Sequence, residues 1–288
     1  MEILEILKII LLGIIEGITE WLPISSTGHM VLFERFFPLT TVSDDFIDMF
    51  EYVIQLAAIF AVVIIFWKRI FPLNIHTNAP TSTGKQSKKI QLGWKKDVLT
   101  LWLKVILACV PAILALVIDS IFSNLSPTME TAVIASALIL YGVAFILIET
   151  FHKTDAKIQE ISELSYKYAF FIGCAQVLAA IPGTSRSGVT ILAALLLGVS
   201  RTAAAEFTFF LAIPTMVGTS AYKMLKFLLN GNVMSGSEMG YLLIGSVVAF
   251  AVSLLIVKFL MDFLKKHDFK VFGWYRIGLG ILVLLSLL

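Results

Sequence analysis

An apolar stretch at residues 4–37 decides the fold of this chain, and it reads LEILKIILLGIIEGITEWLPISSTGHMVLFERFF. Near its middle it is broken by a polar, proline-containing cluster, PISSTGH at residues 23–29. A second apolar stretch, residues 166–198, is broken in the same way by PGTSRSG at residues 182–188. Irregular backbone at membrane depth is tolerated only where protein buries it or water reaches it. Each stretch therefore predicts a re-entrant helical hairpin whose tip lines a polar cavity; two spanning helices with a kink are the alternative.

The composition places the rest of the chain in a membrane. Of its 288 residues, 58% are hydrophobic and 15% are charged, whereas a soluble domain carries about 25% charged residues. The net charge of +2 lacks the basic excess that nucleic-acid binding needs. The expected fold class is an all-α integral membrane protein with two re-entrant hairpins and six transmembrane helices of about 20 residues each. Those helices are expected at Phe46–Trp67, Val98–Ile118, Thr131–Thr150, Ala203–Phe227, Tyr241–Met261 and Val271–Leu288.

The two interrupted stretches also resemble each other. The pattern GxxExxxEWLP that starts at Gly13 aligns with GxxQxxxAIP that starts at Gly173. Three predicted spans follow each hairpin, so one membrane domain divides into a first repeat, residues 1–150, and a second repeat, residues 151–288. An odd number of spans per repeat gives the two copies opposite orientations. Such inverted repeats place their sites near the bilayer midplane, at the interface between the repeats.

Positive charge predicts the orientation, because cytoplasmic loops carry an excess of lysine and arginine. The polar segment Lys68–Asp97, which we expect to be a solvated loop, holds seven of these residues, and the other two loops on that side hold three each. The opposite side has only Arg35, Lys223 and Lys226. The Lys68–Asp97 loop is therefore expected in the cytoplasm, with the first hairpin entering the bilayer from outside and the second from the cytoplasm.

Two carboxylates mark the first hairpin. Glu16 and Glu20 are spaced i, i+4, so they share a helix face with Cβ atoms about 5–6 Å apart. Two carboxylates this close in a low dielectric cannot both stay charged alone. They either share a proton or hold a divalent cation, unless both simply face an aqueous vestibule. Gly13 and Gly17 have the same spacing, and such small residues let another helix approach closely.

The polar cluster after Pro23 predicts the start of a helix whose free N–H groups and positive dipole end face the cavity, where they would bind phosphate. Ser25, Ser26 and Thr27 either cap that helix or take part in binding and chemistry. His29 is the only histidine at membrane depth. It could take a proton from Ser26, with a nearby glutamate orienting the imidazole. Direct attack by His29 and attack by a metal-activated water are the alternatives to a serine nucleophile.

The second cluster repeats this logic with an added arginine. Its glycines, including Gly183, let backbone N–H groups converge on an anion, and Arg186 adds a planar bidentate donor suited to phosphate. An arginine at membrane depth is too costly to be idle, although a structural ion pair with Glu16 or Glu20 would also explain it. Together the two clusters fit a phosphate or diphosphate group and phosphoryl-transfer chemistry. The membrane location implies a lipid substrate.

The residues at both tips resemble a known family. EGITEWLPISSTGH at residues 16–29 resembles the first signature of the bacterial undecaprenyl-diphosphatase family, also called the bacitracin-resistance protein family. PGTSRSGVT at residues 182–190 resembles its second signature. FEYVIQLA at residues 50–57 and SRTAAAEF at residues 200–207 match as well. The resemblance covers essentially the whole chain, and the Lys68–Asp97 segment matches least.

The resemblance implies hydrolysis of undecaprenyl diphosphate to undecaprenyl phosphate and inorganic phosphate. This reaction recycles the carrier lipid of cell-wall synthesis and confers bacitracin resistance. The family is described with Mg²⁺ or Ca²⁺, here matched to Glu16 and Glu20. The resemblance also implies a multi-pass protein of the bacterial plasma membrane whose site opens toward the outer face. A homodimer is compatible with it. The residues expected in catalysis are Glu16, Glu20, Ser26, His29 and Arg186, and those expected to bind the substrate phosphates are Ser25, Thr27, Gly183, Ser185, Ser187 and Thr190.

Two other functions compete with this one. The acid-phosphatase-like lipid phosphatases place a histidine six residues after their arginine and an aspartate four residues further, but here those positions hold Leu192 and Leu196. The other rival is a transporter or flippase for the polyprenyl phosphate lipid, because inverted repeats and broken helices are features of transporters. Phosphate release by the purified protein distinguishes the two, since a pure flippase releases none.

Overall fold

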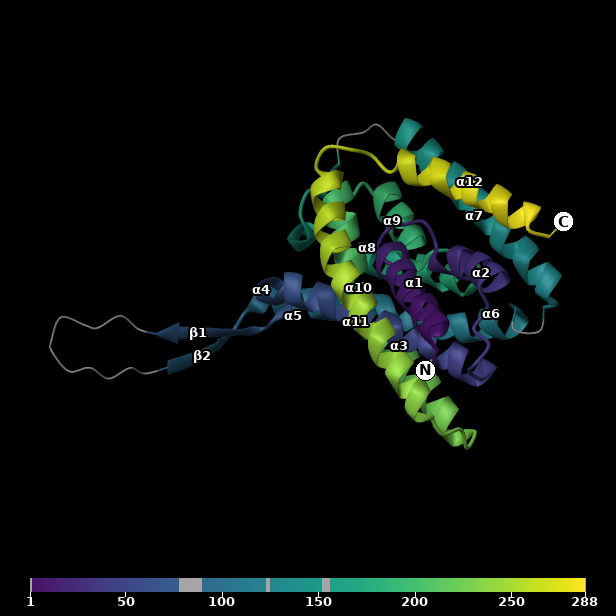
Figure 1. Cartoon of the computed structure of the whole chain (residues 1–288). Coiled ribbons are helices and arrows are strands. Elements are labelled where there is room, and N and C mark those ends of the chain that lie inside the picture. Colours follow the sequence, from purple (N-terminus) through teal and green to yellow (C-terminus); the bar gives the residue numbers. More distant parts are fainter. Residues whose placement is uncertain (1, 78–89, 123–124, 152–155, 288) are drawn as a thin grey trace, which may run out of the picture.

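The computed structural model describes residues 2–77, 90–122, 125–151 and 156–287, and over these ranges the chain is mainly helical. The helices form one body from which a two-stranded β-hairpin projects (Figure 1). The elements of the first half are α1 Ile3–Thr19, α2 Ser26–Phe36, α3 Asp44–Ile65, α4 Trp67–Ile70, β1 Leu73–Thr77, β2 Ile90–Trp94, α5 Lys96–Cys109, η1 Val110–Leu114, α6 Ala115–Phe122 and α7 Pro127–Phe151. Those of the second half are η2 Ile161–Glu163, α8 Tyr166–Gln176, η3 Val177–Ala180, α9 Arg186–Leu196, α10 Arg201–Leu229, α11 Gly236–Leu264 and α12 Lys270–Leu285.

Five helices of the described residues are long and apolar enough to cross a membrane. They correspond to five of the six predicted spans, which confirms a helical membrane protein. The sixth predicted span, Val271–Leu288, overlaps α12, which has 16 residues. At 1.5 Å per residue this helix is about 24 Å long, short of the roughly 30 Å hydrocarbon core. The five long spans are Asp44–Ile65, Lys96–Leu114, Pro127–Phe151, Arg201–Leu229 and Gly236–Leu264.

Each interrupted stretch forms two helices that contact each other and are separated by a proline-containing turn. In the first stretch α1 ends at Thr19 and α2 begins at Ser26. In the second, α8 continues into the short 3₁₀ helix η3 before α9 begins at Arg186. Each intervening turn contains a proline, which cannot continue a helix and disfavours helical geometry in the residue before it. Helices α2 and α9 have 11 residues each and are therefore only about 16 Å long.

The hairpins pack on the other helices in corresponding ways. Helix α1 packs against α11, and α8 packs against α5; across the middle, α3 packs against α10, and α7 lies along α12 (Figure 1). Glycines permit the first two contacts. A Cβ built on Gly13 would lie 2.9 Å from the Gly245 carbonyl oxygen, and one built on Gly17 would lie 2.8 Å from the Ala249 oxygen. The predicted role of Gly13 and Gly17 in close helix approach is thus confirmed.

The apolar core lies mainly around the second hairpin and α10. Phe207, Phe209 and Phe210 of α10 are fully buried in it, and the Trp21 ring of the first turn meets the Phe209 ring edge to face, with centroids 5.4 Å apart. A smaller core joins α1, α2 and α3 with parts of α10 and α11, and includes the fully buried Phe46. The first turn is therefore anchored in the core by a packed aromatic side chain.

Described parts of the segment Lys68–Asp97, which the sequence predicted to be a solvated loop, form two short strands. Strands β1 and β2 pair antiparallel, from Leu73 opposite Trp94 to Thr77 opposite Ile90. The sequence carries the signal, because LNIHT and IQLGW each begin with the alternation of apolar and polar residues that is typical of a strand. Residues 78–89, which include three of the lysines used to predict the orientation, lie outside the described residues.

Candidate functional site

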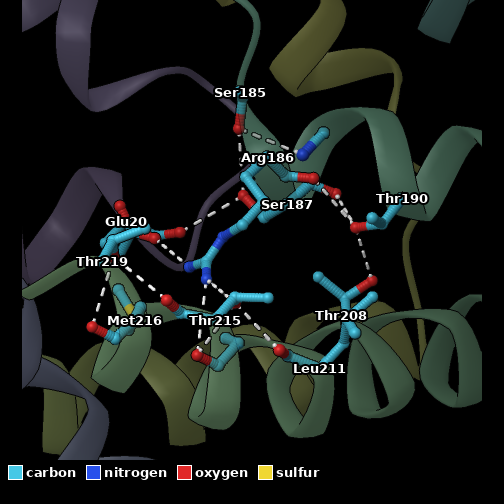
Figure 2. A network of polar contacts seen from close by, with 12 residues as sticks. Glu20, Ser185, Arg186, Ser187, Thr190, Thr208, Leu211, Thr215, Met216 and Thr219 are labelled. Carbon is cyan, nitrogen blue, oxygen red and sulfur yellow. Dashed lines mark hydrogen bonds and ion pairs between the residues drawn. The ribbon is translucent and has the colours of Figure 1, made fainter. Parts of the chain in front are cut away.

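The two turns meet through an ion pair. Arg186, the first residue of α9, pairs through Nη2 with the carboxylate of Glu20, which directly follows α1 (Figure 2). The same guanidinium donates from Nη1 to Thr215 Oγ1 on α10 at 2.8 Å. The ion pair with Glu20, which the sequence left as an alternative, is therefore present. It brings the acidic residue of one hairpin and the basic residue of the other to one place.

Serine hydroxyls tie the turns together further. Ser187 Oγ donates to the main-chain oxygen of Glu20 at 3.2 Å and lies 3.0 Å from Ser185 Oγ (Figure 2). Ser185 caps α9, because its Oγ accepts a hydrogen bond from the Gly188 N–H at 3.0 Å. Both serines are buried. They hold the start of α9 against the first turn, which aims the positive end of that helix at the junction.

Thr190 lies in the interior behind Arg186, and its hydroxyl is bonded to neighbouring protein groups. Its side chain is fully buried, and its hydroxyl donates to the Arg186 main-chain oxygen at 2.9 Å. It also lies 2.9 Å from Thr208 Oγ1 (Figure 2). Thr190 thus links α9 to α10 beneath the arginine, in an arrangement that leaves its hydroxyl away from the surface of the turn.

Several buried polar atoms near the turns have no hydrogen-bond partner among the residues that the structure describes. Unpaired buried polar groups cost free energy, so each calls for an explanation such as a ligand, a water or an ion. Glu16 is almost fully buried, close enough to Glu20, Glu51 and Arg186 for their charges to act on its carboxyl group. The unpaired atoms include Glu16 Oε1, Ser25 Oγ, Thr184 Oγ1 and Gln176 Oε1.

Ser25 is strained as well as unpaired. Its φ is +73°, in a region that residues other than glycine rarely adopt and that clusters at functional sites. It stands at the N-cap of α2, yet in the described structure its side chain makes no cap hydrogen bond. Capping, the structural alternative for Ser25, therefore does not hold. Ser26 and Thr27 follow in the first turn of α2, half-buried and exposed respectively.

His29 is oriented differently from the prediction. Its Nδ1 lies 2.8 Å from the Ser25 main-chain oxygen, and its Nε2 lies 2.8 Å from the Tyr275 hydroxyl. The expectation that a glutamate orients the imidazole is therefore wrong. No hydrogen bond joins Ser26 to His29 in the described structure. Tyr275 was missed because it lies 246 residues further along the chain, and a tyrosine in an apolar helix carries no signal of its own.

Arg276, the next residue of α12, was missed although a signal existed. Its side chain has no exposed surface, and it donates to Pro23 O at 3.2 Å and to Gly183 O at 3.1 Å. These carbonyl groups belong to the first and the second turn respectively. The cost of a charge at membrane depth, which singled out Arg186, applies equally to Arg276.

The metal prediction rests on two carboxylates only. Within the described ranges, no group of three or more histidine, cysteine or acidic side chains is arranged to hold a metal ion. Glu16 offers an unpaired carboxylate oxygen at the junction of the turns. Mg²⁺ is commonly bound by one or two carboxylates plus substrate phosphates, so the residues present fit a cation that is shared with a phosphorylated substrate.

Fold and site together define a helical membrane protein with a buried polar junction built from two broken hairpins. The model of the family described as "Bacitracin resistance protein BacA" matches residues 9–282. The chain belongs to this family.

Curated relatives match over nearly their whole length. A protein of Enterococcus faecalis named undecaprenyl-diphosphatase is 54% identical over 288 residues, covering 99% of this chain and 98% of that protein. A protein of the same name from Streptococcus thermophilus is 50% identical, covering 98% of this chain and 93% of its own. A protein of the same name from Lachnoclostridium phytofermentans is 49% identical, and the match covers 98% of this chain and 97% of that protein.

Proposed function

We propose that this chain hydrolyses undecaprenyl diphosphate to undecaprenyl phosphate and inorganic phosphate at the junction of its two turns. The activity follows from the family and from relatives of about 50% identity that carry this name. The ion pair between Arg186 and Glu20 supports the location, because it assembles a phosphate-binding cation and an acidic group from the two hairpins. The same activity accounts for bacitracin resistance through recycling of the carrier lipid.

The proposed architecture is an inverted repeat in which the first repeat spans residues 1–150 and the second residues 151–288. The packing supports it. Helix α1 meets α11 through Gly13 and α8 meets α5 through Gly173, so each contacts a helix of the other half, while α3 with α10 and α7 with α12 pair across the middle. The proposed setting is the bacterial plasma membrane with the site open to the outer face. Both hairpins enter the bilayer without crossing it.

Residues of both turns are proposed to bind the diphosphate. Arg186 is proposed to donate hydrogen bonds from its amino groups to phosphate oxygens. The N–H groups at the start of α9 add to the positive field at the phosphates. Ser25, Thr27 and Gly183 of the turns are proposed to contact the phosphates. Ser185 and Ser187 extend this set, whereas Thr190 holds Arg186 in place from below.

Glu16 and Glu20 are proposed to hold a divalent cation, Mg²⁺ or Ca²⁺. The unpaired Glu16 oxygen supports this proposal. When bound, such a cation would neutralise part of the diphosphate charge and favour charge build-up on the leaving phosphate. Because Glu20 is also paired with Arg186, the cation and the guanidinium would share one carboxylate, which couples metal binding to the position of the arginine.

Ser26 is proposed as the nucleophile and His29 as its base. This requires the imidazole to leave the Tyr275 hydroxyl, because Nε2 has one lone pair and cannot accept from Tyr275 and take the Ser26 proton together. Direct attack by His29, or by water, are the competing outcomes. Acid-quenched turnover separates them, since phosphoserine survives acid and phosphohistidine does not. A Ser26→Ala variant that keeps a tenth or more of the wild-type rate would exclude Ser26.

Phosphate release in detergent tests the activity itself. The purified protein should release inorganic phosphate from undecaprenyl diphosphate, and a chelator should abolish the release. Glu16→Gln should lower the rate by orders of magnitude while the protein still folds. Glu130→Gln, at an exposed glutamate near the start of α7, is the control and should behave as wild type. Absence of phosphate release together with lipid movement across vesicles would identify a flippase instead.

A further inference from the structure

Arg276 is a fully buried cation whose hydrogen bonds go to main-chain oxygens. Nη1 donates to Pro23 O, Nη2 donates to Gly183 O, and Nε approaches Leu138 O on α7 at 3.5 Å. Its guanidinium also lies 5.6 Å from the centre of the Tyr141 ring. None of the ion pairs among the described residues includes Arg276. Burying a charge without an ionic partner costs free energy. An apolar residue would fill this space at lower cost, so the guanidinium is expected to have a role at the turns.

The two bonds to the turns come from one rigid fork. The guanidinium is planar, so its two amino groups hold their acceptors at a fixed separation and angle. One acceptor, Pro23 O, lies in the turn of the first hairpin, and the other, Gly183 O, lies in the turn of the second. Ser187 and the pair of Arg186 with Glu20 also join the turns. Those links come from the turns themselves, whereas Arg276 belongs to a third element.

That third element is fixed. Helix α12 crosses α7 at a pair of glycines, where a Cβ built on Gly142 or on Gly273 would lie 2.7 Å from the carbonyl oxygen of the other. Both hairpins rest on the same support. A Cβ on Gly183 would lie 2.6 Å from Ile134 Cα of α7, and one on Gly28 would lie 2.9 Å from Leu138 Cδ1. Arg276 therefore projects from a rigid base toward both turns.

The guanidinium also lies directly behind the start of α9. A Cβ built on Gly188 would lie 3.3 Å from Arg276 Nη1 and 3.1 Å from Ser185 Cβ. Any side chain at position 188 would therefore push against the arginine, so the first turn of α9 and the guanidinium fix each other's place. Its charge adds to the positive end of α9.

We propose that Arg276 is a positioning residue that sets the placement of the two turns relative to each other, and that the active geometry depends on its fork rather than on its charge alone. The proposal rests on the proposed site at the junction of the turns. It also predicts an effect that can be measured without an activity assay. The distribution of distances between α2 and α9 should become broader when the guanidinium is removed.

The test compares Arg276→Lys, which keeps the charge, with Arg276→Met and Arg276→Gln. Lys104→Met is the matched control, because Lys104 is likewise a buried cation that donates to a main-chain oxygen, that of Ser162 at 3.1 Å. Turnover of undecaprenyl diphosphate is measured as kcat and KM. In parallel, spin labels at positions 35 and 196, exposed on α2 and α9, report the distance distribution between the hairpins in a background with Cys109 and Cys174 replaced.

All three Arg276 variants should lose at least 30-fold in kcat with less than a fivefold change in KM, and their distance distributions should broaden. The Lys104 control should match wild type in both readouts. Wild-type kcat in Arg276→Lys would show that charge alone suffices, and a narrow distribution in an inactive variant would show that placement is not the cause; either result overturns the proposal. If none of the three folds, Arg276 belongs to the folding core, and the proposal also fails. Normal distances in an inactive wild type would instead count against the proposed function.

Discussion

The pairing of Arg186 with Glu20 means that a bound phosphate would share this guanidinium with a carboxylate. The arginine can serve both only through its several donors, one set toward Glu20 and one toward Thr215. A diphosphate that displaces Thr215 could bind while the Glu20 pair persists. Substrate binding and the link between the two hairpins would then depend on the geometry of one side chain.

Arg186→Lys should fail although it keeps the charge. An ammonium group cannot reproduce the planar bidentate fork, and hydrogen bonds to charged groups contribute about 1.5–3 kcal/mol. We therefore expect kcat/KM for undecaprenyl diphosphate to fall by about tenfold to a hundredfold. Arg35→Lys, at an exposed arginine of α2, should leave the rate unchanged. A fully active Arg186→Lys enzyme would reduce Arg186 to a generic positive charge.

Tyr275 predicts the tautomer of His29. Because a carbonyl oxygen only accepts, Nδ1 must donate to Ser25 O, which leaves Nε2 of the neutral imidazole to accept from the Tyr275 hydroxyl. Nitrogen NMR of protein labelled in histidine should therefore show His29 protonated at Nδ1, with its signals identified by their loss in His29→Gln.

Tyr275→Phe should release one end of the ring and broaden or shift the Nε2 signal, while Tyr222→Phe, at an exposed tyrosine of α10, should not. A wild-type signal from the Nε2–H tautomer would contradict the geometry.

Much of the site could be predicted because charged residues are conspicuous inside apolar runs. Glu16, Glu20 and Arg186 stood out for this reason, and the structure brings them together at the junction of the turns. The partners of His29 could not be predicted. Ser25 contributes its main chain rather than its side chain, and Tyr275 reaches the site only because α12 packs beside α2.

Among the helices, the close glycine contacts give the sharpest prediction. A Cβ on Gly173 of α8 would lie 2.1 Å from the Ala108 carbonyl oxygen of α5, which is backbone and cannot yield. Gly173→Ala should therefore separate α8 from α5, lower the melting temperature and reduce activity. Gly278→Ala on α12, where a Cβ meets nothing within 4 Å in the described structure, should instead be neutral or stabilising by up to about 1 kcal/mol, because alanine favours a helix over glycine. Equal melting temperatures for the two variants would exclude the predicted clash.

The long helices were predictable and the irregular elements were not. Hydropathy finds spans because lipid requires about 20 apolar residues in a row, and five such helices are present. The short strands β1 and β2 lie in a charged segment whose turn signals and lysines outweighed their alternating pattern. The end of α5 was also missed, because Pro111 lies in a 3₁₀ turn, η1, within the predicted span Val98–Ile118.

The orientation of the whole molecule can be tested by labelling from outside. The charge asymmetry predicts that the loop after α10 faces outward and the loop after α11 faces the cytoplasm. In a cysteine-free background, Val233→Cys, at a position 87% exposed, should react with an impermeant thiol reagent in intact cells. Lys266→Cys, also at an exposed position, should react only after the cells are opened. The reverse pattern would invert the proposed topology and close the site to the outer face.

The junction of Glu20 with Arg186 has a consequence for the origin of the protein. Each hairpin supplies only part of the polar junction, so a single repeat could not have assembled it alone. On the proposed inverted repeat, an ancestor of one repeat would have inserted into the membrane in both orientations and formed an antiparallel pair with a second copy. The two halves would then have diverged after gene fusion, one with the acidic pair and the other with the arginine and with Gln176 and Ala180 in the matching places. The catalytic centre of this family would thus have begun as a contact between two identical chains.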